Sequence, residues 1–291
     1  MSVERPTFDL QSHSRHSDGT LAPREVVHAA AQDGVKLLAL SDHDTVDGVG
    51  EAANAAVEVD IRLVPAVEIS AIDQGKTDLH ILGYLVDPKD GTLASRLREY
   101  RGDREHRAQR MAQALRELGF ELNEAPIEER IAQGKSVGRP HLAQAGVGHP
   151  ANAERLAAEA RADPTAFLVG YLIEGAPAFR PRLHPSIEES IEAIHDAGGV
   201  AVWAHPFWDV DDPDEVLAAI ARFRSFGLDG VECFYATHTR EQTELLVARC
   251  AELDLLSTGS SDFHGPEHRQ FSRFRAFSTY GHEPVLGPIS S

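Results

Sequence analysis

The chain has 291 residues, of which 42% are hydrophobic and 25% charged, an ordinary composition for a soluble globular protein of one large domain or one domain with an insertion. The formal net charge of −18 argues against a general basic surface, so we exclude double-stranded DNA as a partner while a small phosphorylated substrate stays compatible. Apolar runs are too short for a membrane span, residues 1–10 lack the pattern of a signal peptide, and two cysteines make no disulfide framework, so we expect a cytoplasmic protein.

The first third of the chain alternates helical and strand-like segments. Residues 22–34 predict a helix with Pro23 near its start and Gly34 at its end, and residues 48–59 predict another. Short apolar runs predict strands at 35–40, 63–67 and 79–86. Strands and helices at this spacing predict parallel βαβ units.

The last third repeats this rhythm. Helices are predicted at 187–197, 213–226 and 240–253, and strands at 200–204, 230–234 and 255–259. The middle of the chain shows only helical patterns, starting with a long one from Leu93 to Gly119. We therefore expect a barrel whose first part is 1–92 and second part 183–291, with a helical insertion domain at 93–182.

Metal-ligand side chains follow several of the predicted strands. His43, Glu68, His205 and the pair Asp262 and His264 each come just after an apolar strand. The carboxyl ends of the strands of a parallel barrel open on one face, so we expect these side chains to meet there. His80 lies near the start of its apolar run, and spacing alone leaves its place open.

The segment from Asp9 to Gly19 packs two histidines, His13 and His16, and two aspartates, Asp9 and Asp18, into a short loop after Phe8–Leu10. Imidazole and carboxylate ligands together suit zinc, manganese or iron. Carboxylates can also bridge two ions, and ions about 3.5–4 Å apart can clamp the attacking and leaving oxygens of an in-line displacement. The pattern therefore predicts a centre with several divalent ions.

Seven segments, in this order, resemble the PHP (polymerase and histidinol phosphatase) superfamily: DLQSHSRHSDGT, ALSDHDTVDG, VPAVEIS, LHILGY, VAVWAHPF, GVECF and STGSSDFHG. More narrowly, the chain is similar to stand-alone phosphoesterases with a helical insertion, which include 3′,5′-nucleoside bisphosphate phosphatases. The resemblance implies a distorted (β/α)7 barrel and three metal ions. It would place one ion on His13, Glu68 and Asp262, a second on Glu68, His80 and His205, and a third on Asp18, His43 and His264.

Gln11 departs from the family pattern, which usually has histidine at this position. A glutamine oxygen can bind a hard ion, although more weakly than imidazole, which favours manganese or magnesium over zinc. We expect two or three divalent ions, with manganese first and iron, zinc or magnesium as alternatives. His16 could compensate, but an ordinary loop histidine is the simpler interpretation.

Substrate contacts are predicted beyond the ligands. Arg139 and His141 form an Arg-x-His step before a helical run and would hold a phosphate. The alternative is that both residues only stabilise the start of the helix. The similar phosphatases have a lysine in a Gly-Lys-Pro step where this chain has Gly175-Ala176-Pro177, and Arg180 or Arg182 is a candidate to replace it. His238 would face the barrel mouth and bind substrate or protonate the leaving oxygen, and His264 is assigned to catalysis as well as to metal.

These features predict a metal-dependent phosphoesterase that hydrolyses a phosphate monoester of a small nucleotide through a metal-bound hydroxide, with a 3′,5′-bisphosphonucleoside as the first choice. The alternatives are a 5′→3′ exoribonuclease on short RNA, a histidinol-phosphate-type phosphatase and, outside the enzymes, a metal-stabilised binding module. Trp203, Phe207 and Trp208 flank His205 and could stack on a base, but Trp203 lies inside its strand and is expected to pack in the core.

Overall fold

The structure is a computed structural model that describes residues 6–74, 76–132, 137–181 and 183–291. The chain divides into two compact units, Met1–Arg98 with Pro185–Ser291, and Glu99–His184. Helix α3 (Gly91–Glu117) begins in the first unit and continues into the second, so the boundary between the units falls within a helix.

The first unit contains a seven-stranded sheet in the order β1 to β7, and the predicted barrel is confirmed. Leu10 N donates to Gly259 O at 3.2 Å, and Ser12 forms a parallel bridge with Phe263, so the first and last strands meet and nearly close the barrel. The strands are β1 (Phe8–Asp9), β2 (Leu37–Leu40), β3 (Arg62–Asp73), β4 (Lys76–Tyr84), β5 (Val200–Trp203), β6 (Gly230–Tyr235) and β7 (Leu256–Ser260).

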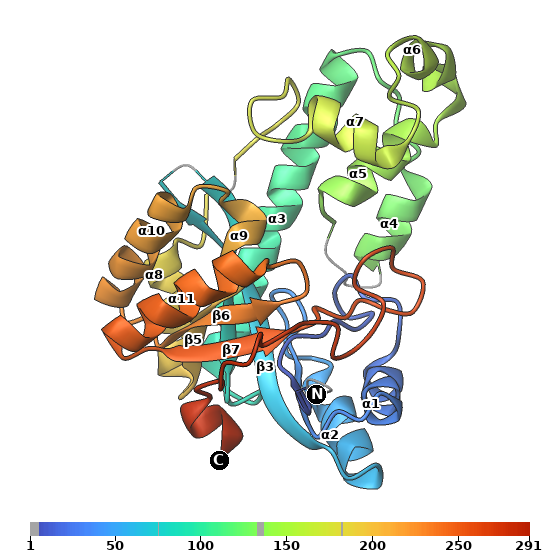
Figure 1. The fold of residues 1–291 in the computed structure, drawn as a ribbon. Helices are drawn as coiled ribbons and strands as arrows, with labels where there is room; N and C mark the ends of the chain where they lie inside the picture. Colours follow the sequence, from blue (N-terminus) through green and yellow to red (C-terminus); the bar gives the residue numbers. More distant parts are fainter. Residues whose placement is uncertain (1–5, 75, 133–136, 182) are drawn as a thin grey trace. The chain divides into compact units, whose positions relative to one another are not determined.

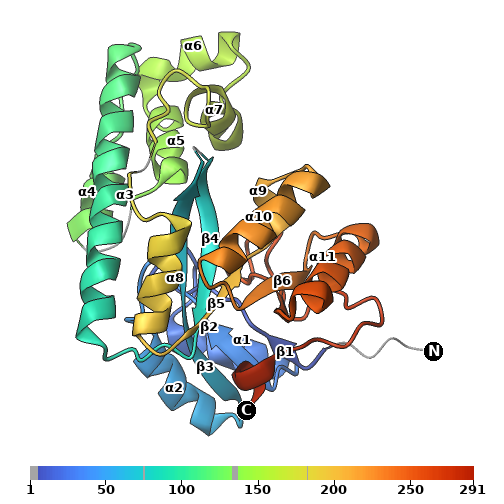
Figure 2. The same cartoon turned by 90° about the vertical axis from the view of Figure 1, so that its left-hand side faces the viewer.

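Helices cover the outside of these strands (Figures 1 and 2). Val26, Val27 and Ala30 of α1 recur at helical spacing and are buried in one cluster with Leu38 and Leu40 of β2, which explains why this amphipathic segment folds as a helix against the sheet. The helices are α1 (Pro23–Gln32), α2 (Val49–Glu58), α8 (Ile187–Asp196), α9 (Pro206–Asp209), α10 (Pro213–Ser225), α11 (Arg240–Leu253) and the 3-10 turn η2 (Gly287–Ser290).

The expectation of parallel units was wrong for residues 63–86. β3 and β4 form an antiparallel hairpin, which is longer than the other strands (Figure 2), and β4 also runs antiparallel to β5. Asp73 ends β3 and Lys76 begins β4, which leaves no room for the crossover that a parallel pair needs. Glu68 therefore lies inside β3, not after a strand that ends at Val67.

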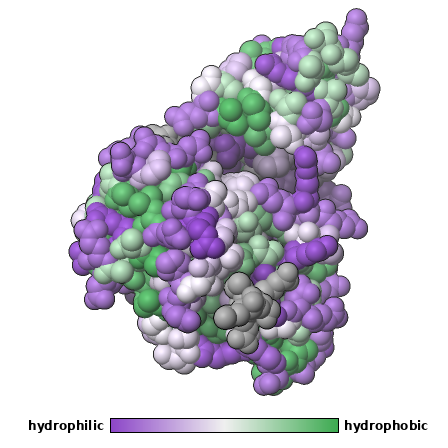
Figure 3. All heavy atoms as spheres, viewed as in Figure 1, coloured by the Kyte–Doolittle hydropathy of each residue, from purple (hydrophilic) through white to green (hydrophobic). Residues whose placement is uncertain are grey.

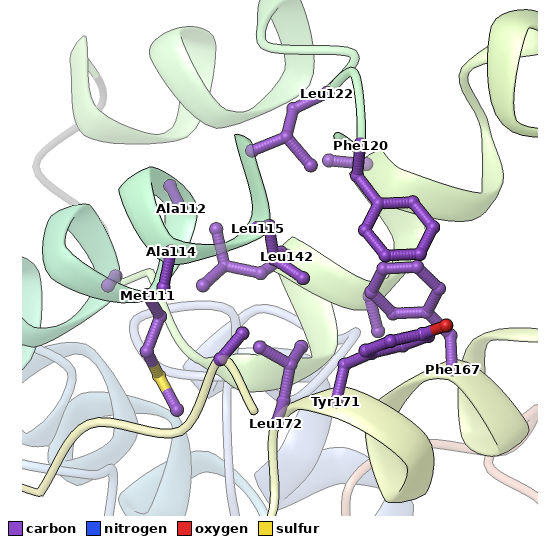
Figure 4. Packing of buried hydrophobic residues seen from close by; sticks show 14 of the residues in the cluster. Met111, Ala112, Ala114, Leu115, Phe120, Leu122, Leu142, Phe167, Tyr171 and Leu172 are labelled. Atoms are coloured by element: carbon purple, nitrogen blue, oxygen red, sulfur yellow. The ribbon is translucent and has the colours of Figure 1, made fainter. Parts of the chain in front are cut away.

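The second unit is helical and has a hydrophobic core of its own (Figure 4). Phe120 contacts Phe167 and Tyr171 with ring centroids 5.2 and 4.7 Å apart, and Leu115 and Leu142 are buried in the same cluster. Besides α3, its elements are α4 (Ala125–Ala132), α5 (Arg139–Val147), the 3-10 turn η1 (Pro150–Asn152), α6 (Ala153–Ala158) and α7 (Pro164–Tyr171).

Hydrophilic side chains dominate the face of the molecule shown in Figure 3. In the described ranges no helix has the length and apolar character that crossing a membrane requires. The large apolar side chains that are exposed come from separate segments of both units: Val57, Ile131, Val169, Leu183, Trp208 and Val285. Trp203, by contrast, is fully buried, as its place inside a strand predicted.

Candidate metal centre

Side chains from separate segments of the first unit form three groups at one end of the barrel. Within each group the nitrogen and oxygen atoms that could bind a metal lie within 4.8 Å of one another. The groups are His13 with Glu68 and Asp262; His43 with Glu68 and His80; and His13 with Asp18, His43 and His264. The first is the set that the resemblance implies for one ion, and the second has His43 where the resemblance implies His205.

The antiparallel direction of β4 explains the position of His80. β4 runs antiparallel to β5, and Ile81 pairs with Trp203, the last residue of β5, so His80 lies beside the residues that follow β5. Ser70 pairs with His80 across the hairpin, and Ala204 N donates to His80 O at 3.0 Å. The sequence left the position of His80 open because β4 was expected to run parallel, and a residue near the start of a parallel strand would lie at the opposite end of the barrel.

Glu68 lies at the middle of these groups and is fully buried. Its Oε2 is 3.0 Å from His13 Nε2, and its Oε1 is 2.7 Å from His80 Nδ1 and 3.3 Å from His205 Nε2. Burial alone would raise the pKa of Glu68, but the imidazoles of His43 and His80 hold it well below its usual range. Both oxygens of an ionised carboxylate thus face imidazole nitrogens, the arrangement that a bridging ligand needs.

The loop after β1 brings His13 and Asp18 to this end of the barrel. Asp18 has its Oδ2 3.5 Å from His43 Nε2 and its Oδ1 3.5 Å from His264 Nε2. The buried Asp42 carboxylate fixes the loop by accepting hydrogen bonds from Ser14 N, Ser14 Oγ and Ser17 Oγ at 2.7, 2.7 and 2.6 Å. Gly19, which follows Asp18, must be glycine, because a Cβ at this position would lie 2.2 Å from His13 O.

Unpaired polar atoms show that the donor set fits divalent ions. His13 Nε2, His43 Nδ1 and Asp262 Oδ1 are buried and have no hydrogen-bond partner among the residues that the structure describes. Burial of such atoms is costly unless they are compensated. Burial also lowers the pKa of His43 to about 4, which keeps its imidazole neutral and able to bind a metal. Imidazole nitrogens with carboxylate oxygens suit manganese, iron or zinc.

Gln11 lies beneath this centre and is fully buried. Its Nε2 donates to Glu68 Oε2 at 3.0 Å, and Ser260 Oγ lies 3.2 Å from its Oε1 and 2.6 Å from Glu232 Oε1. One hydroxyl hydrogen serves only one of these oxygens. Burial raises the pKa of Glu232 to about 8, so its protonated carboxyl can donate to Ser260 while Ser260 donates to Gln11. The two ends of the Gln11 amide are thus both hydrogen-bonded, while its role as a metal ligand stays a prediction.

Replacement of Gln11 by alanine is expected to weaken metal binding by about 10- to 100-fold, because Glu68 loses the amide that orients it. Metal content after dialysis against graded Mn²⁺ would measure this. Gln11→His is expected to retain or strengthen binding, and Gln113→Ala, at an exposed glutamine of α3, is the control. Unchanged binding by Gln11→Ala would contradict both a ligand role and an orienting role.

Three residues at this end have a left-handed backbone, namely His205 (φ 29°), Asp262 (φ 55°) and Asp44 (φ 53°). This conformation costs roughly 1 kcal/mol or more in residues other than glycine. At His205 it is supported by a hydrogen bond from its N–H to Glu232 Oε2 at 2.9 Å. This backbone conformation turns the chain sharply after β5 and β7, at the candidate ligands His205 and Asp262.

His238 follows β6, as predicted, and is buried in the first unit. A bulge at Cys233 interrupts the β6–β7 register, and Cys233 O accepts a hydrogen bond from His238 Nδ1 at 3.2 Å. Burial lowers the pKa of His238 to about 4, so its ring is neutral and Nε2 carries a lone pair. His238 can donate a proton only after taking one up, which a neighbouring phosphate dianion would favour.

The predicted substrate residues of the insertion lie in the second unit. His141 Nδ1 accepts from Gly138 N at 3.0 Å, the helix-start role that was weighed against phosphate binding. It also lines a cavity of about 360 Å³ with Asn123 and Gln144. Arg139 is the first residue of α5, and Arg182 lies outside the described residues. Substrate binding by these residues stays a prediction.

Several supporting residues beside the candidate ligands were not predicted from the sequence. Asp42 fixes the His13 loop, Tyr235 OH donates to Asp262 Oδ2 at 2.8 Å, and Asp209 has its Oδ2 3.6 Å from His205 Nδ1. Tyr235 ends a parallel strand, so the rule that led to His43 could have found it. Asp42 follows the same strand as His43 and could have been found in the same way, whereas Asp209 lies further along the chain, in α9, and offered no comparable signal.

Comparisons with known proteins agree with this geometry. The family model described as the PHP domain matches residues 9–108. A 5′-3′ exoribonuclease of Haemophilus influenzae is 36% identical over 89% of this chain and 90% of its own. A 3′,5′-nucleoside bisphosphate phosphatase of Chromobacterium violaceum is 31% identical over 89% of this chain and 87% of its own.

Two solved structures share the fold. A metal-dependent phosphoesterase from Bifidobacterium adolescentis has a TM-score of 0.73 and 31% identity, over 92% of this chain and 91% of its own. An amidohydrolase from Chromobacterium violaceum, with bound sulfate and no metal, has a TM-score of 0.76 and 29% identity, over 98% of this chain and 93% of its own.

Proposed function

Because this chain belongs to the PHP family of metal-dependent phosphoesterases, we propose that it hydrolyses a phosphate monoester of a small nucleotide, with a 3′,5′-bisphosphonucleoside as its first substrate. The observation that carries the proposal is the convergence of His13, Glu68 and Asp262, whose facing nitrogen and oxygen atoms are only 3.0 Å apart. The nucleotide part is supported by two relatives whose names refer to a nucleoside bisphosphate and to RNA.

The proposed ligands are those that the sequence predicted: His13, Asp18, His43, Glu68, His80, His205, Asp262 and His264, with Gln11 as a weaker ninth. Divalent ions bound there would lower the pKa of a water molecule and offset the negative charge on the phosphoryl oxygens. Manganese is our first choice because oxygen donors from Glu68 and Asp262 stand beside imidazoles.

The protein's own groups fix this set. Tyr235 OH holds Asp262 Oδ2, so the carboxylate presents its other oxygen to His13. The rings of Phe207 and Tyr235 pack against His238 at 5.7 and 5.3 Å. They leave His238 Nε2 as a buried acceptor without a partner in the described part of the chain. In the proposed reaction this atom takes a proton from solvent when a phosphate dianion binds and then donates it to the leaving oxygen.

Phosphate release with added Mn²⁺ tests the proposal on bisphosphonucleosides, mononucleotides, short RNA and histidinol phosphate. We expect the fastest release from bisphosphonucleosides and none after treatment with a chelator, with recovery when Mn²⁺ is restored. Activity on histidinol phosphate alone would overturn the nucleotide assignment. No activity on any phosphoester, with metal bound, would favour the binding module.

The second candidate is the 5′→3′ exoribonuclease, which the 36% identical Haemophilus influenzae relative favours. Release of mononucleotides one at a time from the 5′ end of a short RNA, faster than phosphate release from bisphosphonucleosides, would make it the first choice. The same ligands would serve both reactions, since each breaks a phosphorus–oxygen ester bond.

A further inference from the structure

Four aromatic residues line one side of the candidate metal centre, and we call them the aromatic wall: Trp208, Tyr235, His268 and Phe271. They come from three places in the first unit. Trp208 lies in α9, directly after the ligand His205, and Tyr235 ends β6. The other two belong to the loop that follows β7 and the ligand His264.

Ring contacts join the wall to the candidate ligands at three points, one of which is the His268 ring, 5.2 Å from the His264 ring. The Tyr235 ring is 5.1 Å from the His205 ring, and the Phe271 ring is 5.8 Å from the His264 ring, measured between centroids. Trp208 in turn lies 5.4 Å from Phe271 and 6.4 Å from Tyr235. The indole is therefore two ring contacts away from the ligands, with Phe271 or Tyr235 between.

Backbone hydrogen bonds hold the wall in place. His264 N donates to Phe271 O at 2.9 Å, which closes the loop beside the metal centre. Phe271 N donates to His268 Nδ1 at 2.9 Å, and the two rings lie 15° from parallel. Trp208 N donates to His205 O at 2.8 Å, which ties the backbone of Trp208 to that of a candidate ligand. The wall is thus preorganised rather than formed by free side chains.

The inner and outer members of the wall differ in exposure. Tyr235 and Phe271 are buried, whereas Trp208 is 48% exposed and His268 is also exposed. The rings of Tyr235 and Phe271 meet the indole at 75° and 60°, so neither lies flat on it. In the part of the chain that the structure describes, these are the only rings in contact with Trp208, and its 48% exposure leaves the indole accessible to a ligand.

We propose that the aromatic wall is the subsite for the nucleobase of the substrate, with Trp208 stacking on the base. A nucleotide carries a flat neutral base on one side of its ribose and a phosphate on the other, and the wall offers a flat aromatic face beside a phosphate-handling centre. Bases stack on tryptophan with little dependence on sequence, which suits an enzyme of nucleotides in general. This inference rests on the proposed function, since it requires a nucleotide as substrate.

Trp208→Ala is expected to raise KM for adenosine 3′,5′-bisphosphate by about 5- to 150-fold, the range that loss of one base–aromatic stack gives, while kcat stays near that of the wild type. KM for a base-free ribose phosphate should not change. Trp208→Phe should recover most of the affinity. Val57→Ala, at an exposed apolar side chain of α2, is the control and should leave both substrates unaffected. Thermal melting checks that each variant folds.

Tryptophan fluorescence gives a readout that is independent of turnover. The chain has two tryptophans, and Trp203 is fully buried, so Trp208 is the one that a ligand can reach. Rapid mixing of the metal-loaded protein with adenosine 3′,5′-bisphosphate should quench the emission in the wild type and not in Trp208→Phe. Equal quenching in both proteins would overturn the proposal.

The two proposals can fail separately. If the wild type hydrolyses nucleotides but Trp208→Ala keeps its KM, or raises KM equally for the base-free substrate, the base subsite is wrong and the proposed function stands. If the wild type releases phosphate from base-free sugar phosphates and from no nucleotide, both proposals are overturned.

Discussion

Glu68→Gln is expected to lower phosphate release by about 1000-fold or more. The substituted side chain keeps its size and can still accept the hydrogen bond from Gln11. It loses the negative charge that faces His13, His80 and His205 within 3.3 Å. Metal ions supply several kcal/mol of transition-state stabilisation, and each ~1.4 kcal/mol is tenfold in rate. Initial rates at saturating Mn²⁺, together with metal content, would measure the effect.

Glu232→Gln is the control, because it makes the same replacement of carboxyl by amide at another fully buried glutamate of the barrel, where the carboxyl is protonated and no charge is lost. Glu232 contacts His205 N and Ser260 rather than the imidazole rings, so we expect a much smaller loss of bound metal. If Glu68→Gln kept full metal content and near-normal turnover, the assignment of Glu68 as the shared ligand would be wrong.

His43→Ala is expected to reduce turnover to near zero while the fold is retained. His43 connects two of the three groups, since its Nδ1 is 3.6 Å from Glu68 Oε2 and its Nε2 is 3.5 Å from Asp18 Oδ2. Its loss should therefore weaken two ion sites together, by at least about 100-fold in activity. Phosphate-release kinetics with circular dichroism would separate catalysis from folding.

His28→Ala provides the comparison for that variant. His28 lies on the outer helix α1, where its Nε2 is 4.0 Å from Glu58 Oε2 at an exposed pair, and its replacement should change turnover little. Retained turnover in His43→Ala, with metal content equal to that of His28→Ala, would remove His43 from the ligand set.

Much of the candidate centre could be predicted because parallel strands deliver their following residues to one face. His43, His205, Asp262 and His264 come after β2, β5 and β7, and each belongs to or contacts one of the groups. Helices α10 and α11 were also close to their predicted bounds, since their apolar positions recur at helical spacing. Local sequence patterns were sufficient to predict an element wherever one segment packs on one face of the sheet.

The β3–β4 hairpin could not be predicted by the same reasoning. Residues 62–73 and 76–84 are apolar runs in which pattern alone gives no direction, and pairing direction depends on contacts with distant strands. The hairpin nevertheless supplies Glu68 and His80, two members of one group. The supporting hydrogen bonds of Asp42 and Tyr235 were missed for a related reason, because they join residues far apart in the chain.

The left-handed backbone at Asp262 and His205 has a consequence for distant descendants of this chain. A copy of the gene released from selection for ion binding would be free to lose both side chains, yet the chain would still have to turn sharply after β5 and β7. Glycine and asparagine tolerate such a turn better than alanine or the branched residues do. Relatives that have lost ion binding should therefore have Gly, Asn or Asp at these two positions, while the positions of His43 and His80 accept many residue types.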